Sequence, residues 1–382
     1  DPYLGQISVM RVFSGTLSSN TNVFNVSKNT REKLGQLFYL NGKKETHTDR
    51  VHAGDVVCVV KLKSTLTGNS LTDEKNQVKF DDINFPEPAI SFSIKPKTRS
   101  DEDKISNALH KLTAEDNTFT IKRDAQTREM IASGMGDLHL VIMINRLRKR
   151  FGVQVDIGTP KVAYKETITA QGSSQYKHKK QSGGAGQFAE VWMRIEPLPK
   201  GTGFEFVDEV VGGAIPAAFI VSCEKGIKAA MESGVLAGFP VVDVRAIVYD
   251  GKTHPVYSKD IAFQIAARSA FKEASQKAKP VILEPIMDVD VIVPDEYMGD
   301  ITGSLNQRRG RIMGMEPGDG IQTIKAKVPL EEIYKYVNEL KSITAGRGEY
   351  NMRFSHYEVV PSNIVQTIIA NAQKAKEEAT KA

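Results

Sequence analysis

The stretch "PVILEPIMDVDVIVPDEYMGDITGSLNQRRGRIMGMEP", residues 280–317, decides the fold of this chain. Apolar and acidic residues alternate in its first part, up to Pro294, which predicts a strand. The part from Glu296 to Gly310 predicts a helix, and a second strand is expected from Arg311 onward. The stretch therefore predicts the order strand, helix, strand.

The residues that follow complete this order. "IQTIKAKVP" predicts a strand, "LEEIYKYVNELKSITAG" a helix and "GEYNMRFSHYEVVP" a last strand. The order β-α-β-β-α-β is that of the ferredoxin-like split unit. It also occurs upstream, where the strand pattern "AISFSIKP" leads into a helix that Ser100 is placed to cap. We expect two copies of this topology, at residues 85–160 and 281–362.

The remaining residues predict different modules. Residues 1–82 hold short strand patterns separated by turn signals such as "NGKK", which favours a small β-barrel. Residues 161–280 combine strands with two apolar helices, as in an α/β domain, and residues 363–382 form an amphipathic helix with a charged end. The predicted fold class is a multidomain α+β protein.

Composition places the chain among soluble globular proteins. Its 382 residues are 25% charged and 40% hydrophobic, with a mild net charge of +5. Cys58 and Cys223 lie far apart, so a disulfide framework is not expected and a reducing cytosol is. No apolar run reaches the roughly 18 residues of a membrane helix. The chain begins without Met and already in a strand pattern, so we expect a piece of a longer protein.

Nucleotide-binding motifs fail at their required context. "DGKTH" resembles the end of a phosphate loop, but Ala246 stands where the first glycine should be. "GAGQFA" at Gly184 has dinucleotide-loop spacing, but it precedes a strand where a helix is needed. "SGMGDLH" at residues 133–139 does join a strand to a helix; its amides suit an anion, and a plain connection is the alternative.

Catalytic and metal motifs are not found either. The sequence has no GxSxG, no HExxH and no cysteine cluster. Asp288 and Asp290 alternate on one strand face, which is more typical of a solvated face than of a metal pair. We therefore expect no catalytic, cofactor or metal site in this chain.

Two basic, glycine-bearing loops remain, at residues 171–187 and 249–260. They are either solvated loops or loop tips that contact a nucleic-acid backbone. In the second case the glycines would allow close approach, and Lys179 and Lys180 would neutralise phosphates. "NQRRGRI" could add an RNA contact through Arg308 and Arg309.

Several long strings resemble the bacterial elongation factor G family, the ribosomal translocases. They occur in the family's order over nearly the whole chain: "SGMGDLHL", "QSGGAGQF", "PLPKGTGFEFVDEVVGGAIP", "GFPVVDV", "PVILEPIMDVDV", "PDEYMGDITGSLNQRRGRIMGME" and "AGRGEY". The resemblance implies a GTPase domain first, then a β-barrel, a ferredoxin-like domain, a projecting α/β domain of ribosomal-protein-like fold and a second ferredoxin-like domain. It further implies that the GTPase domain and the first barrel strand are missing here.

The resemblance also implies a function. The projecting domain of this family enters the decoding region, where its tip loops touch A-site tRNA and mRNA; the matching residues are Gln181, Ser182, Gly183, Gly184 and His254. The expected partners are the ribosome, with its rRNA and proteins, tRNA and mRNA, and no membrane. The fragment itself would need no cofactor, while its parent would be a GTPase that uses GTP and Mg²⁺. We expect a cytoplasmic monomer.

Departures from the family pattern lie at the tip and leave more than one function open. Ala185 stands where the family usually has Arg, and acid and Ser are usual near Tyr257 and Lys259. The expected function is the C-terminal part of a GTP-dependent ribosomal translocase, and these differences raise the chance of the alternative, a paralogue that acts in ribosome recycling or under stress. A ribosome-protection protein, a stand-alone RNA-binding module and, last, a metabolic enzyme are competing interpretations.

Overall fold

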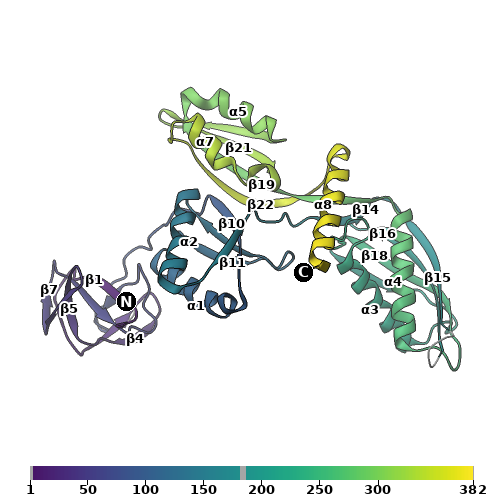
Figure 1. Ribbon diagram of the computed structural model, residues 1–382, viewed down its shortest axis with the longest axis horizontal. Coiled ribbons are helices and arrows are strands. Elements are labelled where there is room, and N and C mark those ends of the chain that lie inside the picture. Colours follow the sequence, from purple (N-terminus) through teal and green to yellow (C-terminus); the bar gives the residue numbers. More distant parts are fainter. Residues whose placement is uncertain (1–2, 181–185, 382) are drawn as a thin grey trace. The chain divides into compact units, whose positions relative to one another are not determined.

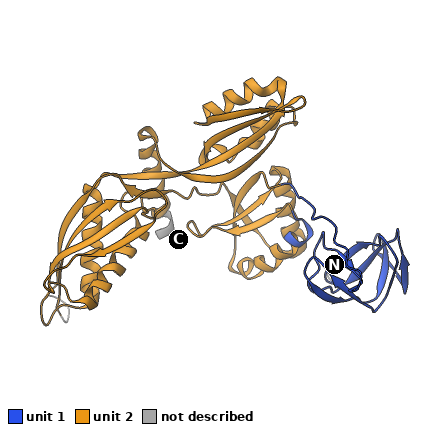
Figure 2. Cartoon of the chain, turned by 180° about the vertical axis from the view of Figure 1, so that it is seen from behind, with its two compact units in different colours: residues 1–86, 113–117 blue, residues 87–112, 118–382 orange. Residues whose placement is uncertain are grey.

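The computed structural model describes residues 3–180 and 186–381, which form two compact units. Unit 1 comprises residues 1–86 and 113–117, and unit 2 comprises residues 87–112 and 118–382 (Figures 1 and 2). The predicted tip residues 181–185 lie outside the described residues.

Unit 1 is built from short antiparallel strands. They are β1 (Ile7–Arg11), β2 (Thr16–Ser18), β3 (Asn22–Asn25), β4 (Thr30–Lys33), β5 (Leu37–Asn41), β6 (Lys44–Thr48), β7 (Arg50–His52), β8 (Val56–Val60) and β9 (Leu71–Thr72). They pair in the orders β1-β8-β5-β6, β4-β3-β9 and β2-β7. Leu34, Leu37, Val57 and Val59 are fully buried in one hydrophobic cluster between these sheets.

The first α+β module of unit 2 has the predicted element order. It runs through β10 (Ile90–Pro96), α1 (Arg99–Glu115), β11 (Thr120–Arg123), β12 (Met130–Gly134), α2 (Asp137–Phe151) and β13 (Val155–Gly158), with strand order β11-β12-β10-β13. Ser100 does not cap α1. The cap is Thr98, whose hydroxyl accepts the amide N–H of Asp101 and whose own N–H donates back to the Asp101 carboxylate.

The last module repeats this order. Its elements are β19 (Pro280–Pro294), the 3₁₀ turn η1 (Asp295–Tyr297), α5 (Met298–Gln307), β20 (Arg311–Pro317), β21 (Ile321–Pro329), α6 (Leu330–Ile333), α7 (Tyr336–Ile343) and β22 (Glu349–Val359). The strands lie in the order β20-β21-β19-β22. The helix expected after β21 is divided in two by a turn at Tyr334 and Lys335.

The residues that lie between these two modules along the chain form a four-stranded sheet that is covered by two helices. It consists of β15 (Gly172–Lys180), β16 (Gln187–Pro197), β17 (Phe204–Asp208) and β18 (Val244–Lys252), with α3 (Ala217–Ser233) and α4 (Asp260–Lys277) packed together (Figure 1). The order is β15-β16-β18-β17, with β17 parallel to β18. The two helices can pack closely because Gly226 has no side chain. A Cβ added at Gly226 would lie only 2.2 Å from the Gln264 carbonyl oxygen. We call residues 161–280 the projecting module.

Two elements join the projecting module to the last module. Strand β14 (Lys165–Ile168) belongs to the 161–280 stretch, yet it pairs with β19 and not with β15–β18. Helix α8 (Ser362–Lys381) follows β22 and packs on a separate hydrophobic cluster that contains Tyr164, Ala237 and Ile282. Sequence patterns did not predict either contact.

Candidate nucleic-acid interface

The two basic stretches of the projecting module are mostly strand and only partly loop. Strand β15 extends to Lys180, so residues 172–180 lie in a β-ladder with β16, in contrast to the expected loop at 171–187. Likewise β18 continues through Gly251 to Lys252, which shortens the second loop to residues 253–259. Both strands extend further because their backbone groups pair with β16, and such pairing does not require an apolar pattern.

The structure brings the two stretches together at one end of the sheet. The amide N–H of Phe188, at the start of β16, donates to the carbonyl oxygen of Tyr257 at 2.9 Å. The hydroxyl of Ser258 donates to the carbonyl oxygen of Phe188 at 2.9 Å. The Tyr257 ring also packs against Gly186, where an added Cβ would meet ring carbon Cδ1 at 2.9 Å. We call the described residues 177–180, 186–188 and 252–259 the distal end.

His254 organises the second loop of the distal end. Its ring nitrogen Nδ1 accepts the amide N–H groups of Val256 at 3.2 Å and Tyr257 at 3.3 Å, and its backbone N–H donates to the Ser258 hydroxyl. Because Nδ1 is an acceptor, the neutral ring carries its proton on Nε2. The ring stacks on Tyr257 with centroids 4.5 Å apart. His254 is half-buried, and among the described residues no hydrogen bond is assigned to its Nε2.

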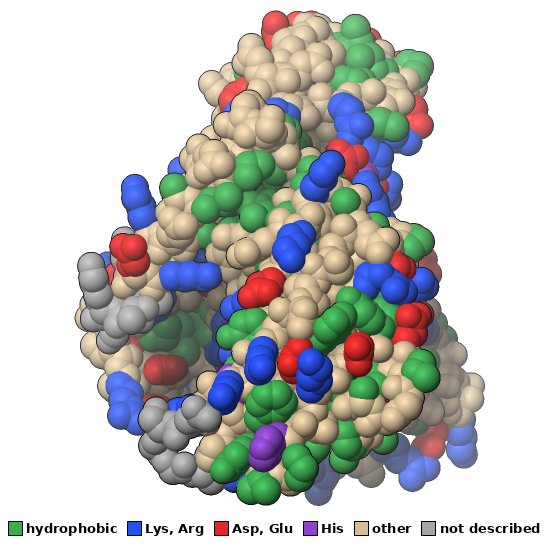
Figure 3. Space-filling view, turned by 90° about the vertical axis from the view of Figure 1, so that its right-hand side faces the viewer, with side chains coloured by type: hydrophobic (Ala, Val, Ile, Leu, Met, Phe, Trp, Pro, Cys, Tyr) green, Lys and Arg blue, Asp and Glu red, His purple; other side chains and the backbone are tan. Residues whose placement is uncertain are grey.

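Lysines on the strands make the distal end basic. Lys177, Lys179, Lys180 and Lys252 are all exposed. The ammonium of Lys177 lies 5.5 Å from the centre of the Phe188 ring, a cation–π contact. Figure 3 shows Lys and Arg side chains gathered beside a histidine and hydrophobic side chains on this side of the molecule.

One buried carboxylate balances part of this charge. Glu190 is 2% exposed and lies in register between Lys177 on β15 and Lys252 on β18. Burial opposes its ionisation, but hydrogen bonds from Gln175 and Trp192, with both lysines nearby, lower the pKa of its carboxyl. Lys179 and Lys180 lie beyond Glu190 toward the loops, so positive charge dominates there.

The predicted contacts Gln181, Ser182, Gly183 and Gly184 cannot be placed, since they lie outside the described residues. Lys179 and Lys180 are in the strand that leads to them, opposite Phe188 and Gln187. Of the predicted tip residues, the structure therefore brings Lys179, Lys180 and His254 to the same end of the module.

Arg308 and Arg309 lie elsewhere and are held inside the last module. The guanidinium of Arg309 makes two parallel hydrogen bonds to Glu284, at 2.7 and 2.9 Å, and a third to Glu332. Arg308 pairs with Glu339 and lies over the Tyr336 ring. Both side chains are about three-quarters buried, so the structure gives them a stabilising role, and RNA contact stays a prediction.

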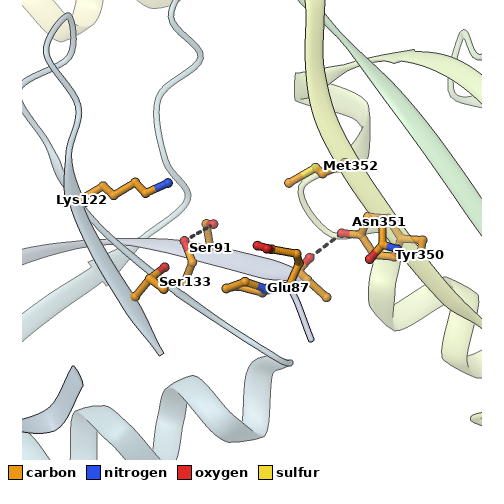
Figure 4. A pocket seen from close by; sticks show the side chains of 10 residues that line it. Glu87, Ser91, Lys122, Ser133, Tyr350, Asn351 and Met352 are labelled. Carbon is orange, nitrogen blue, oxygen red and sulfur yellow. Dashed lines mark hydrogen bonds between the residues drawn. The ribbon is translucent and has the colours of Figure 1, made fainter. Parts of the chain in front are cut away.

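Unit 2 also contains a small cavity that includes none of the predicted site residues. Its volume is about 210 Å³, and the hydroxyls of Ser91 and Ser133 lie 2.7 Å apart in its wall (Figure 4). Beside it, the Tyr350 hydroxyl donates to the Ala89 carbonyl oxygen, which ties β22 to the start of β10. The lining residues are Glu87, Pro88, Ala89, Ser91, Thr120, Lys122, Ser133, Tyr350, Asn351 and Met352.

Two stretches that resemble nucleotide or metal ligands have other surroundings in the part of the chain that the structure describes. Gly251 and Lys252 lie in β18 and lead into a loop, whereas a phosphate loop must open a helix. The carboxylate of Asp288 is engaged by Lys327 at 2.7 Å. Over residues 3–180 and 186–381, no group of three or more His, Cys, Asp or Glu could hold a metal ion, and no helix is long and apolar enough to cross a membrane.

Phe188, Tyr257 and Ser258 were missed as site residues. They carry no charge and no motif, and their role depends on a pairing between segments about 70 residues apart. The nearby departure from the family pattern is a local signal for Tyr257, whereas the local sequence gives no such signal for Phe188 or Ser258.

Comparisons with known proteins cover nearly the whole chain. Family models match for "Elongation factor G domain 2" at residues 1–74, "Elongation Factor G, domain III" at 85–159, "Elongation factor G, domain IV" at 160–279 and "Elongation factor G C-terminus" at 281–368. The chain is 47% identical over 377 residues to elongation factor G of Aquifex pyrophilus, covering 98% of this chain and 54% of that protein.

A solved structure gives the same coverage. A crystal structure of a protein from Thermus thermophilus superposes with a TM-score of 0.81 at 38% identity, over 98% of this chain and 56% of the other. The chain thus spans about half the length of the relatives it matches.

Proposed function

Because this chain belongs to the elongation factor G family, we propose that it is the C-terminal part of a GTP-driven ribosomal translocase, which advances tRNA and mRNA during elongation. In this proposal the parent protein hydrolyses GTP with Mg²⁺, and the present chain converts the resulting movement into displacement of tRNA. Its partners are rRNA, ribosomal proteins, A-site tRNA and mRNA, and it acts as a cytoplasmic monomer.

The modules follow from the strand orders. The orders β11-β12-β10-β13 and β20-β21-β19-β22 support two ferredoxin-like domains, at 85–160 and 281–362. Residues 1–82 are then the β-barrel, 161–280 the projecting domain of ribosomal-protein-like fold, and 363–382 the C-terminal helix and tail.

One observation carries the proposal: the distal end presents Lys179, Lys180 and His254 together, beside the segment that joins β15 to β16. The codon–anticodon duplex is A-form and is recognised through its shape, phosphates and 2′-hydroxyls. Lysines suit the phosphates, and the Nε2–H of His254 can donate to a hydroxyl or phosphate oxygen. Gln181, Ser182, Gly183 and Gly184 would provide the closest contacts.

Toeprinting of a single round of translocation tests the proposal. The chain would be joined to the GTPase domain of an elongation factor G and added with GTP to pre-translocation ribosomes. An advance by one codon is the expected result. Failure to advance while the ribosome still stimulates GTP hydrolysis would refute it.

Ribosome recycling is the second candidate, because Tyr257, near which this sequence departs from the family pattern, makes the contact between the two distal loops. A fusion that splits ribosomal subunits without advancing mRNA would favour a recycling paralogue.

A further inference from the structure

Glu166 on β14 is fully buried, and its carboxylate is held by five successive backbone amides. Oxygen Oε2 accepts the N–H groups of Val235 and Leu236, at 2.5 and 2.8 Å. Oxygen Oε1 accepts those of residues 237–239, at 2.8, 2.9 and 3.0 Å. The carboxylate meets these five donors with two charged oxygens and about four lone pairs, whereas a neutral side chain would offer fewer acceptor sites and a shorter one would not reach.

The same residue connects two modules through its backbone. In the ladder with β19, Glu166 lies opposite Ile282 of the last module. On its other side it forms a parallel bridge with Val241: its N–H donates to the Pro240 carbonyl, and its carbonyl accepts the N–H of Val242. The residue thus lies between the sheet of the last module and the loop that follows α3.

Hydrophobic side chains shield this arrangement from water. Tyr164, Ala237, Ile282 and Ile368 are buried in one cluster, to which α8 contributes. In such a low-dielectric setting hydrogen bonds to a charged group are strong, and an unpaired donor is costly.

We infer that Glu166 is a positioning residue: its carboxylate locks the projecting module onto the sheet of the last module, so that the distal end follows movements of residues 281–362. This inference rests on the proposed function, since a translocase must transmit motion to the tip. Without the carboxylate contact, the joint would keep the four-residue strand β14, the backbone bridge at Val241 and the hydrophobic cluster, but residues 235–239 would lose their five hydrogen bonds to β14.

The test compares Glu166→Gln with Glu32→Gln in the whole chain. Glu32 is a matched control, because its buried carboxylate also accepts backbone amides, those of Lys63 and Ser64, but in unit 1. Spin labels would be placed on Lys225→Cys and Asp319→Cys, both exposed, while the native Cys58 and Cys223 are buried. Double electron–electron resonance then measures the distance distribution between the two modules.

We expect a narrow distribution for the unsubstituted chain and for Glu32→Gln, and a broad one for Glu166→Gln. Amide hydrogen exchange at residues 235–239 should accelerate about tenfold or more in Glu166→Gln only. An unchanged distribution, or equal broadening in both variants, would overturn the inference. If Glu166→Gln does not fold, Glu166→Asp, which keeps the charge but shortens the side chain, should show the same broadening, and an unchanged distribution in that variant would overturn the inference.

Activity separates this inference from the proposed function. In the GTPase-domain fusion, Glu166→Gln should slow translocation more than ribosome-stimulated GTP hydrolysis. Normal translocation with a loosened joint would refute the positioning role. If the unsubstituted fusion fails to translocate, the proposed function fails, whereas the distance and exchange results still decide whether the carboxylate locks the joint.

Discussion

Phe188 and Tyr257 are joined by a backbone hydrogen bond of 2.9 Å, which connects the start of β16 to the loop before α4. Ser258 adds a second bridge to the same residue, since its hydroxyl donates to the Phe188 carbonyl. The two loops of the distal end are therefore one structural unit, and a change in either should affect both.

Ser258→Ala should disturb this unit without unfolding the module. The substitution removes the bridge to Phe188 and the acceptor for the His254 amide, for a loss of about 1 kcal/mol per hydrogen bond. We expect slower translocation in the fusion and a small decrease in melting temperature. Ser233→Ala is the control, since the Ser233 hydroxyl donates to the Ala230 carbonyl oxygen within helix α3. Equal translocation rates for the two variants would contradict the prediction.

His254 should act through both of its ring nitrogens, and two substitutions can separate these roles. His254→Ala removes the Nδ1 acceptor and the Nε2–H, whereas the Asn side chain in His254→Asn can still accept the amides of Val256 and Tyr257. We expect His254→Asn to translocate about tenfold more slowly, the effect of one lost hydrogen bond of about 1.4 kcal/mol, and His254→Ala more slowly still because it also loses the Nδ1 acceptor, with GTP turnover largely intact in both. Rapid-kinetic translocation assays measure this. If His254→Asn behaves like the unsubstituted protein, the ring only orders the loop.

Alternating patterns helped to predict the two repeated modules, since strands such as β21 and the second half of β19 alternate between buried and partly exposed residues. The ends of β15 and β18 were expected to be loops because their basic, glycine-bearing sequences lack such an alternating pattern. Lys177, Lys179 and Lys180 belong to the end of an edge strand, where polar residues occupy both faces and backbone pairing alone maintains the strand.

Contacts between segments that are distant in the sequence could not be predicted from local sequence patterns. Nothing local to Glu166 indicates that its carboxylate would meet the amides of residues 235–239, about 70 positions away. In the same way, "NQRRGRI" suggests a basic RNA-binding stretch, but the partners of Arg309 come from β19 and α6. Charge in a sequence cannot distinguish an ion pair from a ligand contact.

Lys179 and Lys180 should contribute salt-dependent affinity for the ribosome. If each contacts a phosphate, Lys179→Gln/Lys180→Gln should reduce the slope of log affinity against log salt by about 1 to 2. Lys200→Gln/Lys225→Gln is the control, because it removes the same charge from exposed positions of the projecting module outside the distal end. Filter binding to ribosomes at several salt concentrations gives the slopes. Equal slopes for the two double variants would refute a phosphate contact.

Arg309 should prove to be a stability residue. Arg309→Met leaves the Glu284 carboxylate, whose side chain is 4% exposed, without its partner, and we expect a loss of about 3 kcal/mol in unfolding free energy. Arg309→Met/Glu284→Met should recover most of this loss. Chemical denaturation measures both variants. Ribosome binding that stays weak in the stabilised double variant would instead indicate that Arg309 contacts RNA.

Glu32 should make the stability of unit 1 sensitive to acid. Burial opposes its ionisation, but hydrogen bonds from Ser64, Lys63 and Thr65 outweigh this effect and lower the pKa of its carboxyl to about 2. A lowered pKa in the folded state stabilises the protein above the unfolded value of about 4.5, and this contribution is lost as the pH falls toward 2. The shift corresponds to about 3 kcal/mol at neutral pH.

Glu32→Gln is neutral at every pH, so it isolates this contribution. The unsubstituted chain should exceed the variant in stability by about 3 kcal/mol at pH 7, and the difference should shrink between about pH 5 and pH 2. Hydrogen exchange of the buried Val57 and Val59 amides, corrected for the intrinsic rate at each pH, reports the stability of unit 1 within the whole chain. A difference that stays constant down to pH 2 would show that Glu32 stabilises the unit through packing and not through its charge.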